Sequence, residues 1–527
     1  MSTTRTLARA GLVVSGAFLA ARVLGWLRFV VIANVFGPTA DLDAFIAAFR
    51  IPDLMFQLVA AGALSAALIP VVTGVLHSDG EARAWRVVST VTNLMLLALL
   101  ALATFALLAA DRLVPLFTSG FDALTMSRTI ELTRIMLLSP ILLSLGAVAT
   151  SVLNARGRFA AAALAPIAYN LAIIGAVLLL GPSLGITGVA IGVVAGSAGH
   201  LLVQVAPLRA IGFRYLPQID LSDSAARRAL GLMGPRAIGL GASQITFIVA
   251  TALATPLGTG ALTAFTSAFT LLQIPIGVIG VPLGVVLFPS LSREVASGNH
   301  DEFVSLLTRA MRLLAFVMIP IAALAAILRI EGVSLLFRRF DPATVELIAV
   351  TLVAFLVGLA AHALIGVLAR AFYARQDTRT PVLAAILAVV VNTTLATLLV
   401  GPLKLPGIAL AIAIAAWVEA GVLVLLLRRR VGRLGLAQVA WLAARTVLAA
   451  AVATVVASLV HAAVLPTLLP GPTAAGLGGI AATVAVIGIV TAVFGAVFAG
   501  AALALRIEEL RSIVGIMVDA LHRPRRS

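Results

Sequence analysis

Apolar stretches of about 20 residues recur along the entire chain and are separated only by short breaks of Gly, Pro or charged residues. A helical stretch of this length crosses the roughly 30 Å of hydrocarbon in a bilayer. Hydrophobic residues make up 61% of the 527 residues and charged residues 11%. A water-soluble globular chain of this composition would expose large apolar patches. The sequence therefore predicts an all-α polytopic membrane protein.

Counting these stretches predicts about fourteen transmembrane helices, joined by connections too short to hold a soluble domain. The stretches fall at about 11–35, 42–75, 86–110, 129–154, 159–181, 185–208, 230–254, 260–290, 304–328, 343–372, 380–401, 405–427, 436–465 and 475–504.

Basic residues are distributed unevenly between alternate connections. If the N-terminus is cytoplasmic, the inside connections and tails hold 25 arginines and the outside connections hold six basic residues. The positive-inside rule then predicts that both termini are cytoplasmic and explains the net charge of +16 without a nucleic-acid partner. Arg5 and Arg9 precede an apolar run as in a signal peptide. Apolar sequence continues past Arg22, however, so we expect an uncleaved first helix.

A weak internal repeat divides the chain. "AFIAAF" at 44–49 recurs as "AFTSAF" at 264–269, and six predicted helices separate the copies, so both halves enter the membrane in the same direction. Chance similarity in an Ala-rich sequence is the alternative. Parallel repeats are a transporter architecture with the substrate site between the halves. We expect two six-helix lobes, 1–216 and 217–434, followed by two extra helices and a basic tail, 435–527.

The sequence offers no catalytic or cofactor motif. It contains no cysteine, and its single lysine, Lys404 in "PLKLP", rules out a Walker A loop. HExxH and GxSxG are absent, and the six histidines show no metal-ligand spacing. The chain is therefore predicted not to be an enzyme and to need no cofactor. Transport would draw on the membrane potential, a cation gradient or a partner.

Arginines lie inside the first two predicted spans, where each charge costs roughly 2.5–3.5 kcal/mol. Arg22 and Arg28 in "ARVLGWLRFVVIANVFG" lie about 120° apart on an ideal helix, and Gly25 between them would allow a bend toward one cavity. Snorkelling or pairing with an acid is the alternative. Asp43 and Arg50 share a face of the second span, and Asp53 is also a near neighbour of Arg50. One or both acids would either neutralise Arg50 or reach Arg28. An acid-poor, Arg-rich cavity suits an anionic cargo.

The second half carries fewer charges. Arg236 follows Pro235 near the cytoplasmic side, where a snorkelling anchor is the competing interpretation. Glu419, a lone acid, is predicted either to couple ions or to pair locally. Arg445 is predicted to be an interfacial anchor.

Three longer motifs resemble the MurJ/MviN lipid II flippases of the multidrug/oligosaccharidyl-lipid/polysaccharide exporter superfamily. They are "ARVLGWLRFVVIANVFGPTADLDAFIAAFRIPDLM", "GVIGVPLGVVLFPSLSREVASGNHDEF" at 277–303 and "RAFYARQDTRTPV" at 370–382. With fourteen helices, the resemblance covers essentially the whole chain. It implies an inner-membrane flippase that moves lipid-linked peptidoglycan precursor outward through a central cationic cavity. The two extra C-terminal helices would form a groove for the lipid tail.

The resemblance also implies site residues. It places functional arginines at Arg22 and Arg28, an acid at Asp43 and a basic residue at Arg50. Asp377 in "ARQD" would couple ions, with helix capping or pairing with Arg379 as the alternative.

The chain departs from that family pattern at several cavity positions. Phe56 and Gln57 stand where two arginines are usual, Ala61 replaces a glutamate, and Thr270 replaces the arginine of the eighth helix. Either Arg28, Arg50 and Arg236 suffice for the diphosphate, or the cargo differs, or the chain is a divergent paralogue.

The leading hypothesis is a lipid II flippase that works by alternating access in the bacterial inner membrane. Its partners would be lipid II or a similar undecaprenyl-diphosphate-linked sugar, membrane lipids and possible cell-wall synthesis proteins. The alternatives are a drug/cation antiporter, another lipid-linked oligosaccharide exporter, or a non-transporting cell-wall scaffold.

Overall fold

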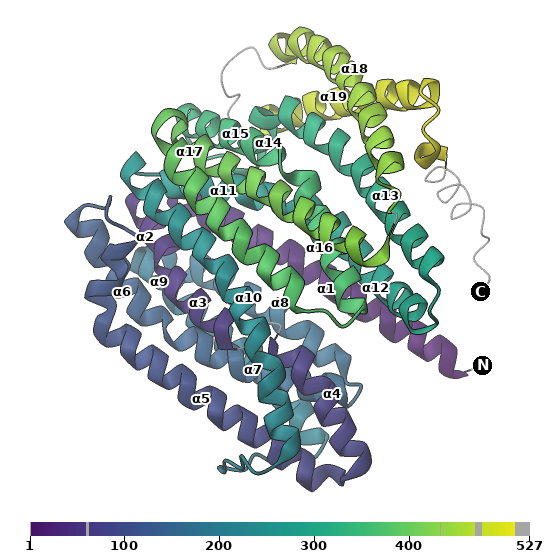
Figure 1. Cartoon of the computed structure of the whole chain (residues 1–527). Coiled ribbons are helices and arrows are strands. Elements are labelled where there is room, and N and C mark those ends of the chain that lie inside the picture. The colour runs from purple at the N-terminus through teal and green to yellow at the C-terminus, as the bar shows by residue number, and fades with distance from the viewer. Residues whose placement is uncertain (1, 60–62, 433, 469–476, 512–527) are drawn as a thin grey trace. The chain divides into compact units, whose positions relative to one another are not determined.

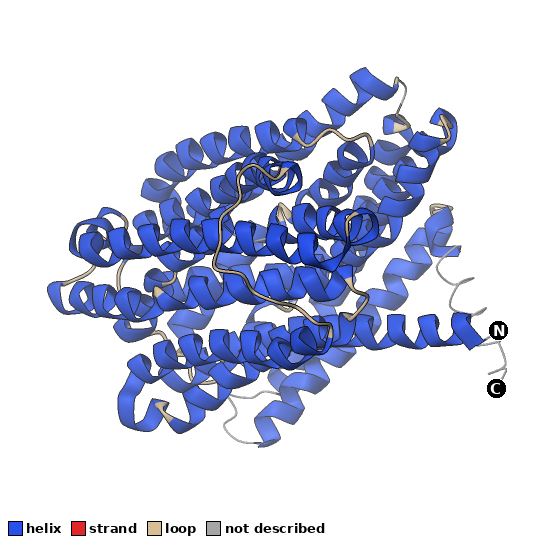
Figure 2. Cartoon of the chain, turned by 90° about the horizontal axis from the view of Figure 1, so that it is seen from below, coloured by secondary structure: helices blue, strands red, loops and turns tan. Residues whose placement is uncertain are grey.

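The computed structural model describes residues 2–59, 63–432, 434–468 and 477–511, and throughout these ranges it consists of helices and their connecting loops (Figure 2). The all-α fold predicted from the sequence is confirmed. Contacts divide the chain into two compact units, residues 1–263 and 264–527. Lobes defined by the internal repeat, with a boundary at 216–217, are a different division and stay a prediction.

The first unit contains ten long or medium helices and two 3₁₀ turns in its described part (Figure 1). They are α1 (Ser2–Phe36), α2 (Ala40–Ala48), α3 (Arg50–Val59), α4 (Ala63–Ser78), α5 (Gly80–Leu113), η1 (Val114–Leu116), α6 (Ala123–Met136), α7 (Leu138–Ala155), α8 (Phe159–Leu179), α9 (Gly181–Ala210), α10 (Ser224–Ala254) and η2 (Thr255–Leu257).

The boundary between the two units falls in the first turn of α11. Its elements are α11 (Ala261–Pro275), the π-helical turn η3 (Ile276–Gly280), α12 (Val281–Ala296), α13 (His300–Ile327), α14 (Arg329–Leu336), α15 (Pro342–Leu356), α16 (Leu359–Ala374), α17 (Arg379–Val431), α18 (Leu436–Leu468) and α19 (Leu477–Ala504).

Within the described residues, eleven helices are long and apolar enough to cross a membrane, or up to twelve if the bent pair α15 and α16 is one span. Fourteen spans therefore stay a prediction. The 53-residue α17 enters this count once, although a straight helix of that length would measure about 80 Å. It is interrupted at Lys404 (φ 53°, ψ −136°), and a Cβ on Gly407 would lie 2.4 Å from the carbonyl oxygen of Leu399. The helix thus doubles back into two arms in contact.

The same turn occurs 219 residues earlier in the chain. Gly185 has non-helical dihedrals (φ 57°, ψ −143°), and a Cβ on Gly188 would lie 2.9 Å from the carbonyl oxygen of Leu180. Gly185 and Gly188 thus correspond to Lys404 and Gly407. The close approach excludes any side chain at Gly188, which explains why glycine stands at both contact points.

A second pair of turns matches at the same spacing. Gly157 (φ 71°) and Gln376 (φ 59°) both adopt the left-handed conformation after a helix end. In each turn the next amide, that of Arg158 or Asp377, donates to the carbonyl five residues earlier. These are Schellman-type caps. Two shared turn geometries at a constant offset support the internal repeat proposed from "AFIAAF" and "AFTSAF".

The second predicted span, 42–75, is not one continuous helix. It is divided into α2, α3 and α4, and α2 gives way to α3 at Phe49. Pro52 favours a break here, because proline has no amide hydrogen to donate to the carbonyl four residues earlier, whereas in the first turn of a new helix no such bond is needed. Asp43 and Arg50 therefore lie on two different helices, α2 and α3.

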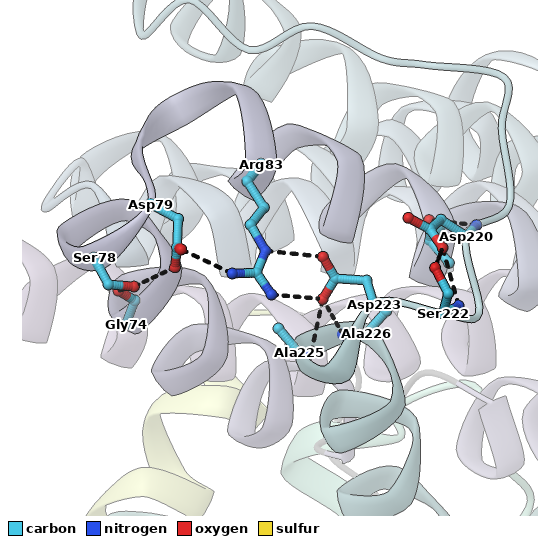
Figure 3. Close-up of polar contacts among 10 residues, drawn as sticks. Gly74, Ser78, Asp79, Arg83, Asp220, Ser222, Asp223, Ala225 and Ala226 are labelled. Carbon is cyan, nitrogen blue, oxygen red and sulfur yellow. Dashed lines mark hydrogen bonds and ion pairs between the residues drawn. The ribbon is translucent and has the colours of Figure 1, made fainter.

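The segment between α9 and α10 is bound to α5. Arg83 on α5 donates from Nε to Asp223, at 2.9 Å, and from Nη1 to Asp79, at 2.8 Å (Figure 3). Asp223 also caps α10 by accepting from the amides of Ala225 and Ala226. The hydrogen bonds from Arg83 hold the pKa of the Asp223 carboxyl below its ordinary 3.8. Two helices far apart in sequence are thus joined by one guanidinium group.

Further along α5, side chains bind the backbone of this segment. Ser89 accepts from the amide of Leu216, and Asn93 donates to the carbonyls of Leu216 and Gln218. Tyr215 donates to Asn93 at 2.6 Å. The connection to α10 is therefore a fixed part of the first unit, which explains why α10 belongs to that unit.

In the second unit, a buried acid joins α14 to α18. Glu331 is 5% exposed, and its Oε1 lies 2.7 Å from Nε2 of His461. The second oxygen of Glu331 is buried and has no hydrogen-bond partner. The pair therefore depends on the single contact with His461.

Candidate functional site

The first unit brings together two of the arginines predicted to bind substrate. Arg28 lies on α1 and Arg50 begins α3, and both side chains are half-buried. Asp53, one turn after Arg50, interacts electrostatically with both guanidinium groups. The cluster therefore has two cationic members and one anionic member.

Arg28 is positioned by an aromatic residue of α8. Its guanidinium carbon lies 5.3 Å from the centroid of the Tyr169 ring. A cation over an aromatic face is attracted by the ring quadrupole. This contact orients Arg28 and leaves its charge unneutralised.

Arg50 is positioned by α10. Its Nε donates to the hydroxyl of Thr251 at 2.8 Å, and its guanidinium carbon lies 5.6 Å from the centroid of the Phe247 ring. Thr251 in turn donates to the carbonyl of Phe247, so the acceptor is held by its own helix. Only one of the guanidinium's nitrogens is used in this hydrogen bond.

Among the residues that the structure describes, no ion pair within 4 Å includes Arg28 or Arg50. Other arginines of the same unit are paired, as Arg134 is with Asp111 at 2.6 Å. Two half-buried guanidinium groups with one nearby acid retain excess positive charge. Such groups bind phosphate oxygens bidentately and cannot deprotonate, so the cluster is suited to a phosphorylated anion.

Asp43 takes a different place from the one expected. It is 1% exposed and faces the chain at 260–263 rather than Arg50. Its Oδ2 accepts from the amide of Gly260 at 2.6 Å, and its Oδ1 accepts from the amide and hydroxyl of Thr263 at 2.7 and 2.6 Å. Gly260 precedes α11 and has no side chain to cap it. Asp43 supplies that cap from 217 residues away, and no ion pair joins it to Arg50 or Arg28 in the described residues.

The remaining predicted residues of the first unit are less closely tied to the cluster. Arg22 is half-buried on α1, which continues through Gly25 as one helix. Gln57 is half-buried two turns after Arg50 on α3. Phe56 packs against the hydrophobic core, which explains why an apolar residue is accepted there. Arg236 lies on α10, but its side chain, like Ala61, falls outside the described residues.

The second unit holds the other predicted residues. Thr270 is half-buried on α11 and donates to the carbonyl of Thr266 at 2.7 Å. Glu419 is half-buried on α17. Asp377 caps α17 by accepting from the amides of Arg379 and Thr380, and it forms an ion pair with Arg430. The alternative that Asp377 caps a helix therefore agrees with the structure. Its arginine partner is Arg430, whereas the sequence suggested Arg379.

Sequence reasoning did not single out Tyr169, Phe247 or Thr251. The chain has only three tyrosines. A phenol near the middle of an apolar span is therefore a signal that could have identified Tyr169. Thr251 and Phe247 gave no comparable signal, because threonine and phenylalanine are common in membrane helices.

Solved structures with the same fold are transporters. A lipid II flippase MurJ in an inward closed conformation matches with a TM-score of 0.75 at 22% identity, covering 92% of this chain and 98% of that one. An inward-facing multidrug resistance transporter of the MATE family and MOP superfamily matches with a TM-score of 0.68 at 17% identity, covering 80% and 98%. The chain therefore has the fold of these multi-span membrane transporters.

Sequence relatives specify the family. The family model for "Lipid II flippase MurJ" matches residues 32–476. The lipid II flippase MurJ of Burkholderia cenocepacia is 32% identical over 435 residues, covering 80% of this chain and 84% of the relative. The probable lipid II flippase MurJ of Vibrio cholerae is 31% identical over 437 residues, covering 80% and 83%. The chain belongs to the MurJ family of lipid II flippases.

Proposed function

We propose that this protein is a lipid II flippase that moves the diphosphate-sugar headgroup from the cytoplasmic to the outer leaflet of the inner membrane. The family match over residues 32–476 carries this proposal. Flipping a lipid needs no covalent chemistry. It needs a polar path for the headgroup while the prenyl tail stays in hydrocarbon.

In this proposal Arg28 and Arg50 bind the diphosphate, with Arg22 adding charge on the same helix as Arg28. Tyr169 and Thr251 hold the two guanidinium groups ready, so little side-chain ordering remains when the anion arrives. Gln57, Thr270 and Arg236 would add polar contacts. The arginines usual at positions 56, 57 and 270 are then dispensable, because Arg28 and Arg50 already provide two positioned cations.

The membrane potential supplies a driving force for alternating access in the outward direction. With both termini cytoplasmic, the anionic headgroup moves away from the negative side. Each negative charge then gains about 2.3 kcal/mol per 100 mV. Coupling to a cation that moves inward at Asp377 or Glu419 would act in the same sense. Cell-wall synthesis proteins would supply and use the substrate on either side.

Complementation tests the proposal directly. A bacterium depleted of its own flippase should be rescued by the native chain and by Arg134→Ala, which removes an arginine already neutralised by Asp111. Arg28→Ala should fail to rescue despite normal membrane levels. Arg28→Lys should rescue only in part, because lysine cannot bind a diphosphate bidentately.

Two outcomes would count against the proposal. Full rescue by Arg28→Ala would remove that residue from the headgroup path. Failure of the native chain to rescue, with normal expression and with dye efflux in its place, would favour the drug/cation antiporter.

A further inference from the structure

A cationic pocket lies entirely within the second unit. It is a cavity of about 200 Å³ where α13 passes the start of α18 and the segment after α19. Arg312, Arg445 and Arg506 line it together with Trp441 and Glu509. In the orientation predicted from the sequence, this end of the bundle faces the cytoplasm.

The three arginines of the pocket differ in their partners. Arg312 is neutralised, because its Nε donates to Glu509 at 2.5 Å and its Nη2 lies 3.5 Å from Glu508. Arg445 stacks over the Trp441 ring, with its guanidinium carbon 4.5 Å from the ring centroid. Within the described ranges, no ion pair within 4 Å includes Arg445 or Arg506. The pocket thus presents two guanidinium groups with no acidic partner.

The pocket also contains an unused acceptor. One oxygen of Glu509 accepts from Arg312, whereas the other, Oε2, is buried and has no hydrogen-bond partner. A buried acceptor without a donor is unfavourable by about 1–3 kcal/mol. A ligand that fits this pocket therefore carries both an anion for the arginines and a hydrogen-bond donor for Glu509.

The surface beside the pocket identifies the kind of ligand. Trp441, Leu448, Val452 and Val455 are 45–61% exposed and lie seven, four and three residues apart, so they form one apolar stripe on α18. From Trp441 to Val455 the stripe rises roughly 21 Å, which lies within the roughly 30 Å of the hydrocarbon core. A molecule bound in the pocket can therefore extend acyl chains along this stripe, which a free phosphate cannot do.

We propose that this pocket binds the headgroup of a glycerophospholipid. The phosphate lies at Arg445 and Arg506, the headgroup's hydroxyl or ammonium donates to Glu509, and the acyl chains follow α18. Phosphatidylglycerol and phosphatidylethanolamine satisfy both requirements. Phosphatidylcholine lacks the donor. The site serves a resident membrane lipid and does not depend on which cargo the transporter moves.

Lipid binding to the purified full chain tests this assignment. Delipidated protein is titrated with each of the three phospholipids while the bound lipid is counted by native mass spectrometry. Phosphatidylglycerol or phosphatidylethanolamine should bind at one site at least tenfold more tightly than phosphatidylcholine. The double variant Arg445→Ala/Arg506→Ala should lose that site, and Glu509→Gln should reduce the preference over phosphatidylcholine. Arg428→Ala, at an exposed arginine outside the pocket, is the matched control.

Three results would overturn the assignment. Equal binding of phosphatidylcholine would remove the role of Glu509. If inorganic phosphate protects the protein against thermal unfolding as well as the phospholipids do, the pocket is a site for free anions. Displacement of the phospholipid by undecaprenyl diphosphate would assign the pocket to the transported lipid. If the double variant unfolds, Arg445→Lys, which keeps the charge but not the stacking, provides the same comparison in a milder form.

Discussion

The buried cap at Asp43 makes a quantitative prediction. Asp43→Ala removes the acceptor of three short hydrogen bonds and leaves two backbone amides and one hydroxyl near Gly260 and Thr263. The Thr263 hydroxyl can rotate to another acceptor, whereas the two amides cannot. At roughly 1.5–2 kcal/mol for each stranded amide, plus about 1 kcal/mol for the lost helix cap, the variant should be destabilised by about 4 kcal/mol.

This loss should be visible as a change in melting temperature. For a unit of this size, 1 kcal/mol corresponds to about 2–4 °C, so Asp43→Ala should melt roughly 10 °C lower than the native chain. Asp43→Asn keeps one acceptor oxygen, but its side-chain NH2 group then faces a backbone N–H donor. About half of the loss in melting temperature is therefore expected. Thermal unfolding in detergent, followed by far-UV circular dichroism, measures both.

Asp41→Asn is the control for this series. Asp41 lies two residues earlier, is exposed, and has only a 3.5 Å contact with Arg128, so its change should stay below about 0.5 kcal/mol. The reasoning is refuted if Asp43→Ala melts with the native chain and instead loses lipid II binding per folded molecule. That result would return Asp43 to the substrate site that the sequence predicts.

Three further perturbations have expected outcomes. Because the pKa of Asp223 is lowered in the folded protein, its carboxylate stabilises the fold above about pH 4, and this stabilisation is lost as the pH falls through the pKa of the folded state. Asp223→Asn should therefore remove this part of the fall in melting temperature at acid pH. An unchanged dependence of melting temperature on pH would contradict the prediction. His461→Ala leaves buried Glu331 without a donor and should cost about 3 kcal/mol, with partial recovery in His461→Gln, both measured by thermal unfolding. Gly188→Ala should cost about 1–3 kcal/mol by the same assay, whereas Gly199→Ala, on the same helix with open space around it, should be nearly neutral.

The helical fold could be predicted from the sequence because apolar length alone determines where a chain can cross a membrane. Breaks inside the predicted spans were harder to locate. Pro52 lies at the start of α3 inside the predicted second span. The turn at Lys404, in contrast, lies between the predicted spans 380–401 and 405–427. Lys404 carries no sequence sign of a left-handed conformation, whereas its counterpart 219 residues earlier is a glycine.

The charged members of the site could be predicted, and their partners could not. Arg28 and Arg50 stood out because charge in an apolar span is costly. The groups that orient them lie on helices that pack nearby only after folding, as Thr251 does at 201 residues from Arg50. Asp43 was assigned to the substrate site through the family resemblance. Its true donors, Gly260 and Thr263, could not be predicted, because they are ordinary residues in a distant turn.

The order in which the chain is made gives these long-range contacts another consequence. The donors of Asp43 are synthesised 217 and 220 residues after it, and Thr251 follows Arg50 by 201. At about 5–20 residues per second, the wait is roughly 10–45 s. During that time the first helices are already made, but their carboxylate and guanidinium groups have no final partners. Water, lipid headgroups or the insertion machinery must accommodate these charges until α10 and the turn after it emerge, so the first unit matures late although it is translated first.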